Sequence, residues 1–291
     1  FLPKIIKHLD ILNLFPNIAI SPKERIEFLR EHSALLLDPK TEESRPTTDA
    51  VIFTGTSSHA DQLRLIFDSR TLFIANGAGH NPVVVSEDAE EEAATQAVIT
   101  LAFYNQGQDC AAPNSILVHK KIYENFMGRL YKKFDELKIG SYSDHSCRIG
   151  PLSNPNDLKY LQALLVDNRQ WIDRKTKGVI RTADAILEPT IISKPLKEGG
   201  NYEEAFAPIL FIQKYEKDTD LAMYFEDPKY ALNAMYLTLF GESKYVKNII
   251  GKKINGKILH HNDTFLHNTH LHAHGVERGT QPYGGYGYGA S

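Results

Sequence analysis

The chain has 291 residues, of which 42% are hydrophobic and 24% are charged, and its formal net charge is -3. This composition is typical of a globular protein large enough for two domains, and it shows neither a basic cluster dense enough for nucleic acid nor an apolar run long enough to cross a membrane. Two cysteines cannot build a disulfide framework, and free thiols favour a reducing, cytoplasmic compartment.

The ends of the chain suggest that it is part of a longer protein. The opening FLPKIIKHLDILNLF is interrupted by charged residues, which excludes a signal-peptide core. The chain starts at Phe1 and stops at Ser291 inside the glycine-rich PYGGYGYGAS.

The first part of the chain predicts a helix and then strands. Ser21 and Glu24 form a capping-box pattern at the start of SPKERIEFLREH. A short buried strand is expected at 34–37, a loop at 38–49 and a strand at 50–54.

Strands and helices then alternate to the end. A helical pattern covers 57–69, strands are expected at 71–75 and 82–86, and Ser86 is expected to cap a helix over 87–105. Later strands are expected in the segments SILVH, PTII, PILFIQKY, NAMYLTLFG and KILHH, and later helices in YENFMGRLYKKFDELK, DLKYLQALLVDN, DLAMYF and YVKNIIGKK. This alternation predicts an open, largely parallel α/β sheet.

Ligands of such sheets bind at the carboxyl ends of strands. That rule points to the turn after Thr54, the segment after Ala75 and the end of the helix that delivers Cys110. In FTGTSS a glycine turn opens a helix and offers N–H groups to an anion, although such a turn is also an ordinary cap.

Cys110, in NQGQDCAAP, has two interpretations. A cysteine can fill a core gap, or it can be a nucleophile if its thiolate is stabilised. Asp109 opposes the thiolate if the two side chains point the same way, so local chemistry leaves both interpretations open.

Seven short motifs occur in one order along the chain: FTGT (53–56), NGAGHNP (76–82), NQGQDC (105–110), GPL (150–152), EPT (188–190), EEAFAP (203–208) and PYGG (282–285). This set resembles the aldehyde dehydrogenase superfamily, whose motifs read F-T-G-S, E-L-G-G-K-N-P, G-Q-x-C, G-P-L, E-P-T, E-x-F-G-P and P-F-G-G. Asn76 and Cys110 are also 34 residues apart, the separation between the general base and the nucleophile of that family.

The resemblance implies an α/β, aldehyde dehydrogenase-like fold, in which a partial dinucleotide-binding parallel sheet is followed by an α/β catalytic domain. Residues 1–77 would form the C-terminal part of the cofactor-binding domain, 78–282 the catalytic domain, and 283–291 the start of a truncated C-terminal tail. The full-length form would be a homo-oligomer, a dimer or a tetramer.

The resemblance also implies NAD(P)-dependent oxidation of an aldehyde. The cysteine attacks the aldehyde carbon, hydride passes to NAD or NADP, and the resulting thioester is released by water or coenzyme A. Cys110 matches the nucleophile, and its N–H matches half of the oxyanion hole. The matching binding positions are Gly55 and Thr56 for the pyrophosphate, Glu204 for the nicotinamide ribose, Phe206 beside the nicotinamide, and Tyr104 and Tyr283 in the aldehyde tunnel.

Asn76 is the main departure from the family pattern, because it replaces the glutamate that activates the deacylating water. An amide cannot accept that proton. The methylmalonate-semialdehyde branch also carries Asn there and uses coenzyme A. A coenzyme A-acylating semialdehyde dehydrogenase and a non-catalytic family member therefore stay open as alternatives.

Two further features bear on the ligands. The family motifs for the adenosine ribose and the second half of the oxyanion hole are not found in residues 1–49. His270, His272 and His274 share one face of a possible strand, but no cysteine accompanies them, and we expect tunnel-wall or surface histidines rather than a metal site. The expected partner is a small aldehyde, with no nucleic acid and no membrane.

Overall fold

A computed structural model describes residues 21, 24–37, 39–77, 79–230 and 236–249, and short strands at 253–254, 257–258, 265–267 and 285–288. Contacts between Cα atoms divide this part of the chain into two compact units. One comprises the described residues within Phe1–Val51, Asp61–Phe73 and Tyr288–Ser291; the other comprises those within Ile52–Ala60 and Ile74–Gly287. The functional boundary expected after residue 77 stays a prediction.

The first unit contains helix α2 (Arg25–Ser33) and a hairpin of β1 (Leu35–Leu37) and β2 (Ser44–Pro46). The predicted reciprocal hydrogen bonds are present, because Glu24 Oε2 accepts from the Ser21 N–H at 3.1 Å and Ser21 Oγ accepts from the Glu24 N–H at 3.4 Å. The predicted N-cap at Ser21 is wrong, because α2 begins at Arg25 and its N-cap residue is Glu24. The strand at 35–37 is also confirmed, but its predicted burial is wrong. Its three leucines are exposed because its partner is a polar segment of the expected loop rather than an apolar strand.

Three of the next elements have residues in both units. They are β3 (Ala50–Thr54), α3 (Ser57–Arg64) and β4 (Leu72–Asn76), as the alternating pattern predicts. Together with β15 (Gly285–Tyr288), the two strands form a small sheet in the order β15-β4-β3.

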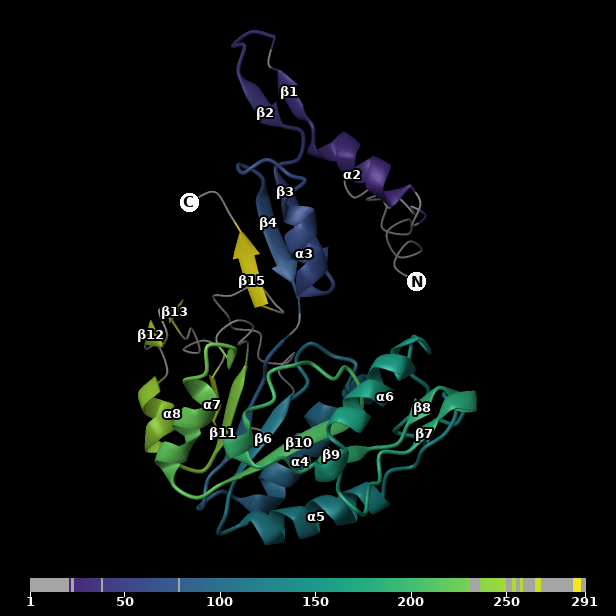
Figure 1. The fold of residues 1–291 in the computed structure, drawn as a ribbon, viewed down its shortest axis with the longest axis vertical. Helices are drawn as coiled ribbons and strands as arrows, with labels where there is room; N and C mark the ends of the chain where they lie inside the picture. The colour runs from purple at the N-terminus through teal and green to yellow at the C-terminus, as the bar shows by residue number, and fades with distance from the viewer. Residues whose placement is uncertain are drawn as a thin grey trace. The chain divides into compact units, whose positions relative to one another are not determined.

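The second unit is organised around a six-stranded sheet in the order β14-β11-β5-β6-β10-β9, in which every neighbouring pair is parallel (Figure 1). Its strands are β5 (Val83–Val85), β6 (Ser115–His119), β9 (Thr190–Ile192), β10 (Ile209–Tyr215), β11 (Leu237–Phe240) and β14 (Phe265–His267). The predicted parallel α/β sheet is therefore confirmed.

Helices cover both faces of this sheet (Figure 1). On one face α4 (Glu91–Phe103) and α5 (Tyr123–Asp135) pack against Val83, Val85 and Ile116. On the other face α7 (Ala222–Phe225) and α8 (Lys244–Ile249) pack against Val84 and Leu117, and α6 (Asp157–Asp167) packs against Ile209 and Phe211. The period-two alternation of strand side chains explains how both faces are apolar, and why these strands read as continuous hydrophobic runs.

Shorter elements complete the second unit. They are β7 (Ile180–Arg181) with β8 (Ile186–Leu187), β12 (Lys253–Ile254) with β13 (Lys257–Ile258), and the 3-10 turns η1 (Tyr104–Gly107), η2 (Arg169–Trp171), η3 (Thr182–Asp184), η4 (Leu196–Glu198) and η5 (Asp218–Leu221). None of the helices that the structure describes is both long enough and apolar enough to cross a bilayer.

Helix α4 starts later than the sequence predicts. Its N-cap is Glu90, whose carboxylate accepts from the N–H groups of Glu92 and Ala93 at 3.1 and 2.6 Å. The expected cap at Ser86 is wrong, because the acidic run supplies a second capping side chain closer to the apolar stretch. The helix still ends at Phe103, immediately before the loop that carries Cys110.

The core between α5 and the sheet should account for much of the stability of the second unit. Leu130 is fully buried in it, so Leu130→Ala should lower the free energy of unfolding by about 2–5 kcal/mol. Lys132→Ala, an exposed position of the same helix, should change it by less than about 0.5 kcal/mol. Equal urea midpoints for the two variants would contradict this packing.

Candidate active site

A left-handed turn delivers Cys110 from the end of α4. Asn105, Gln106 and Gly107 have φ values of 46, 57 and 72° in succession. Non-glycine residues adopt this region rarely, although asparagine does so more readily. Asn105 Nδ2 supports the turn by donating to the carbonyl of Gln108 at 2.9 Å. Cys110 follows this turn and lies in the loop before β6.

The side chains of this turn are tied to the segment that contains the GPL motif. Gln108 Nε2 donates to Ser153 Oγ, and Gln108 Oε1 accepts from the Ser153 N–H, both at 3.0 Å. Gln106 Oε1 accepts from the Tyr142 hydroxyl at 2.8 Å. The motifs G-Q-x-C and G-P-L, 40 residues apart in the sequence, thus meet in one hydrogen-bonded loop cluster.

Asn81 fixes the backbone on the other side of Cys110. Its Nδ2 donates to the carbonyls of Cys110 and Ala112 at 2.7 and 3.0 Å, and its Oδ1 accepts from the Tyr236 N–H at 3.1 Å. Asn114 Oδ1 accepts from the Asn81 N–H at 2.8 Å. Neither asparagine belongs to the residues predicted for the site. The signal that could have indicated them is their place just before a fully buried strand, where a polar residue needs partners.

Gly79 joins the cysteine loop to Glu204. A Cβ atom built on Gly79 would overlap the carbonyl oxygen of Cys110, so only glycine allows this approach. The N–H of the same residue donates to Glu204 Oε1 at 3.3 Å. The thiol-bearing residue and the acid of the EEAFAP motif therefore share one backbone neighbour, although they are 94 positions apart.

The surroundings of Cys110 disfavour its thiolate. Burial, followed by the negative charges of Asp109 and Glu204, raises the pKa of the Cys110 thiol to about 12. Asp109 is itself buried, and its Oδ1 accepts from the Ala111 N–H at 2.9 Å. The opposition from Asp109 that the sequence left open is therefore present, and this loop alone does not activate the thiol.

Glu204 is held as a readily protonated carboxyl. Burial, with a smaller contribution from the charge of Asp109, raises its pKa to about 7, and the Gly79 N–H only partly offsets this. A carboxyl that titrates near neutral pH can both accept and donate a proton under ordinary conditions.

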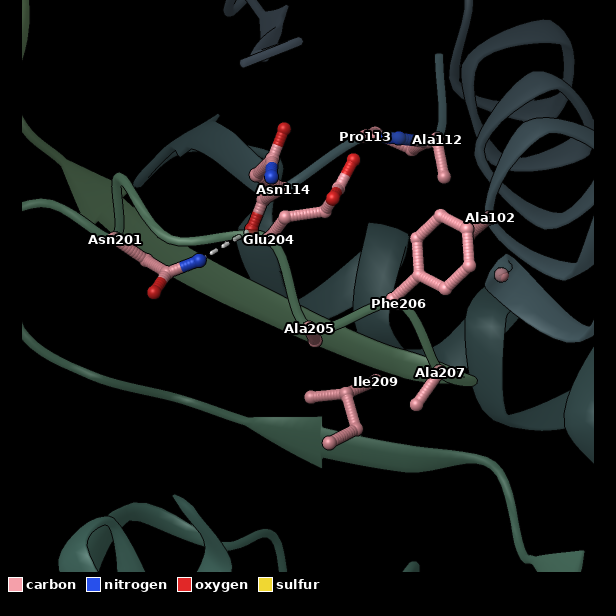
Figure 2. Close-up of a pocket in the computed structure, with 11 residues that line it drawn as sticks. Ala102, Ala112, Pro113, Asn114, Asn201, Glu204, Ala205, Phe206, Ala207 and Ile209 are labelled. Atoms are coloured by element: carbon pink, nitrogen blue, oxygen red, sulfur yellow. Dashed lines mark hydrogen bonds between the residues drawn. The ribbon is translucent and has the colours of Figure 1, made fainter. Parts of the chain in front are cut away.

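Glu204 also lines a small cavity of about 10 Å³, roughly the space that one water molecule needs. Figure 2 shows its carboxylate pointing toward Ala112 and Pro113, with the side chain of Asn114 beside it. Asn201 Nδ2 donates to the Asn114 carbonyl at 3.1 Å, which links the two loops around this cavity.

Phe206 borders the same cavity in a strained backbone conformation. Its φ is 50°, and 42% of its surface is exposed (Figure 2). The next residue, Ala207, replaces the glycine of F-G-P, and its φ is not in the left-handed region, so a side chain is tolerated there. The position that requires glycine is Gly107 in the neighbouring loop, because a Cβ atom on Gly107 would overlap the carbonyl oxygen of Ala207.

The structure does not bring the remaining predicted site residues into the loop cluster around Cys110 and Glu204. Gly55 and Thr56 are exposed at the start of α3, where Thr56 Oγ1 contacts His59 Nδ1 at 2.9 Å. Tyr104 is 55% exposed on η1. Asn76 is the last residue of β4, but its side chain lies outside the described part of the structure, as do Tyr283 and His270, His272 and His274.

Comparison with known proteins identifies the family. A model described as the aldehyde dehydrogenase family matches residues 21–280. The chain belongs to this family. The 3,6-anhydro-alpha-L-galactose dehydrogenase of Vibrio sp. (strain EJY3) is 29% identical over 187 residues, covering 62% of this chain and 38% of that protein. A benzaldehyde dehydrogenase of Bacillus subtilis (strain 168) is 28% identical over 244 residues, covering 80% of this chain and 48% of that protein.

A solved structure confirms the predicted aldehyde dehydrogenase-like fold. The succinate-semialdehyde dehydrogenase from Burkholderia pseudomallei superimposes with a TM-score of 0.67 at 20% identity, covering 87% of this chain and 49% of that chain. In each of these comparisons the chain spans less than half of the relative's length.

The close approach of Gly79 to the Cys110 carbonyl can be tested by substitution, with an exposed glycine as the control. Gly79→Ala should shift the Cys110 loop and lower the free energy of unfolding by about 1–3 kcal/mol, because the new methyl group overlaps backbone. Gly128→Ala, on the exposed face of α5 with no atom near the added Cβ, should instead raise it by up to about 1 kcal/mol. Chemical denaturation measures both, and a neutral Gly79→Ala would contradict the approach.

The pKa of Glu204 predicts a pH-dependent effect on stability. Because folding raises this pKa from 4.5 to about 7, the stability that the protonated carboxyl contributes is complete below about pH 4.5 and is lost as the pH rises to 7. Glu204→Gln should therefore raise the free energy of unfolding by about 1–3 kcal/mol more at pH 8 than at pH 4. Urea unfolding at both pH values tests this, and an equal effect at both would show that Glu204 is not desolvated.

Proposed function

We propose that the protein oxidises an aldehyde with NAD or NADP, through an acyl group held covalently on Cys110. The observation that carries the proposal is the meeting of three family motifs around one residue, since Gly79 abuts the Cys110 carbonyl and donates to Glu204. Asn81, from the same motif as Gly79, holds the carbonyl of the nucleophile position at 2.7 Å. These contacts hold the backbone of Cys110 in place, and covalent catalysis needs a nucleophile in a fixed position.

The loop that contains Glu204 and Phe206 carries groups that suit a nicotinamide cofactor. An exposed aromatic ring at Phe206 and a carboxyl at Glu204, two positions apart on one loop, suit a flat ring and its ribose hydroxyls. The exposed Gly55–Thr56 turn at the start of α3 offers backbone N–H groups for the pyrophosphate. When bound, the cofactor supplies a hydride acceptor.

The chain's own groups then have distinct roles. Cys110 Sγ forms the bond to the aldehyde carbon, and the Cys110 N–H binds the resulting oxyanion. The thiol must lose its proton for this attack, and the high pKa of Cys110 makes that loss the difficult step. Tyr104 and Tyr283 are proposed to line the aldehyde tunnel.

A second candidate function is supported by Asn76. An amide at the position of the general base favours a coenzyme A-acylating semialdehyde dehydrogenase, in which a thiol rather than water receives the acyl group. Addition of coenzyme A should then accelerate steady-state turnover after an initial burst.

The organisation of the whole protein is proposed from the family. Residues 1–77 belong to a cofactor-binding domain, 78–282 to a catalytic domain and 283–291 to a C-terminal tail. The full-length form is proposed to be a cytoplasmic dimer or tetramer.

The proposal predicts that Cys110→Ser abolishes product formation. With an aldehyde panel and NAD or NADP, reduced nicotinamide should appear with the unmodified chain, and its rate should fall at least about 10³-fold in this variant. Cys147→Ser, which changes the second cysteine, should leave the rate unchanged. Absence of product with every aldehyde, or retained activity in Cys110→Ser, would favour a non-catalytic family member.

A further inference from the structure

The proposed reaction leaves one role without a residue. Release of the acyl group by water needs a base, and Asn76 cannot accept a proton. Among the described residues, two carboxylates lie close enough to Cys110 to raise the pKa of its thiol, those of Asp109 and Glu204. Within the described part of the chain, these two carboxylates are therefore the candidates for a base if water is the acyl acceptor.

Asp109 is poorly suited to this role. Only 7% of its surface is exposed, and its Oδ1 is engaged with the Ala111 N–H at 2.9 Å, inside the loop that it helps to shape. The carboxyl of Asp109 therefore acts as a structural group.

Glu204 is held beside the nucleophile loop and next to a space for water. One of its oxygens accepts from the Gly79 N–H at 3.3 Å, and Gly79 in turn abuts the Cys110 carbonyl, so the carboxyl is fixed beside the nucleophile loop. The side chain lines a cavity with room for about one water and points toward Ala112 and Pro113, which follow Cys110 (Figure 2).

We propose that Glu204 is the general base that activates water for release of the acyl group from Cys110, an inference that rests on the proposed function. The Glu204 carboxylate takes one proton from water as the water oxygen bonds to the thioester carbon. The bond between that carbon and Cys110 Sγ then breaks, and the electron pair stays on sulfur. The proton passes from Glu204 to the thiolate, which regenerates the thiol and the carboxylate and releases a carboxylic acid.

The charged groups around Glu204 support its proposed role as a general base. The ionisable groups that interact with its charge are Asp109 and Cys110 from the nucleophile loop and Tyr160 from α6, whose hydroxyl donates to the Glu204 carbonyl. The adjacent Glu203 is exposed. None of these is a cation, so the carboxyl is not held in its ionised form, and its pKa of about 7 lets it exchange a proton near neutral pH. The base form predominates above pH 7, so release should slow as the pH falls below that value.

The role can be separated from cofactor binding. Loss of a ribose contact weakens cofactor binding, whereas loss of the base slows release even when no cofactor is present. An ester such as p-nitrophenyl acetate acylates a cysteine without hydride transfer, so it isolates the release step.

The test is a pulse-chase of the acetylated chain without cofactor. After brief treatment with p-nitrophenyl acetate and removal of the ester, intact mass follows the acetyl group, and peptide mapping locates it. Acetyl-Cys110 should persist about 10²-fold longer in Glu204→Gln than in the unmodified chain. The matched control is Glu203→Gln, the exposed neighbour, which should release acetate at the normal rate. In the unmodified chain the rate should rise through about pH 7, and Glu204→Gln should lose this rise.

The outcomes separate this inference from the proposed function. If Cys110 is not acetylated in the unmodified chain, both are overturned. If acetyl-Cys110 forms but Glu204→Gln releases it at the normal rate and with the normal pH profile, the base role of Glu204 is overturned while the nucleophile stands. Glutamine can still accept from the Gly79 N–H, so acetylation of the variant also shows that the loop is intact.

Discussion

The contact between Gly79 and the Cys110 carbonyl is the constraint on which the site depends. It places a main-chain N–H beside the nucleophile loop, and that N–H holds Glu204. Gly107 makes the corresponding contact with the Ala207 carbonyl, on the far side of the EEAFAP loop. Two glycines thus allow three loops from distant parts of the sequence to pack with their backbones in contact. This packing brings Glu204 next to the loop that carries Cys110.

This packing also places groups that can carry negative charge near one another. Two carboxyls and a thiol lie in a partly buried space, and each negative charge disfavours the next. The consequence is a protonated thiol and a carboxyl that titrates near neutral pH, which is a pair suited to moving one proton between them.

Sequence patterns predicted the parallel sheet and most of its elements, because buried strands such as Val83–Val85 and Ser115–His119 read as short apolar runs between helical patterns. The motif order located Cys110 and Glu204. The hydrogen bonds that Asn81 and Gln108 make around the Cys110 loop were not predicted. Their partners, Ala112, Tyr236 and Ser153, come close only through the tertiary structure. The exposure of Leu35–Leu37 and the cap at Glu90 were missed for the same reason: several local pairings compete, and packing decides among them.

The central claim is that the Glu204 carboxyl lies close enough to Cys110 for its charge to act on the thiol. The most direct test is the pH dependence of Cys110 alkylation by iodoacetamide, mapped by peptide mass, in the unmodified chain and in Glu204→Gln. Because the Glu204 charge raises the pKa of the thiol, the alkylation profile of Cys110 should move to lower pH in the variant, while that of Cys147 stays in place. An unchanged Cys110 profile would contradict the account.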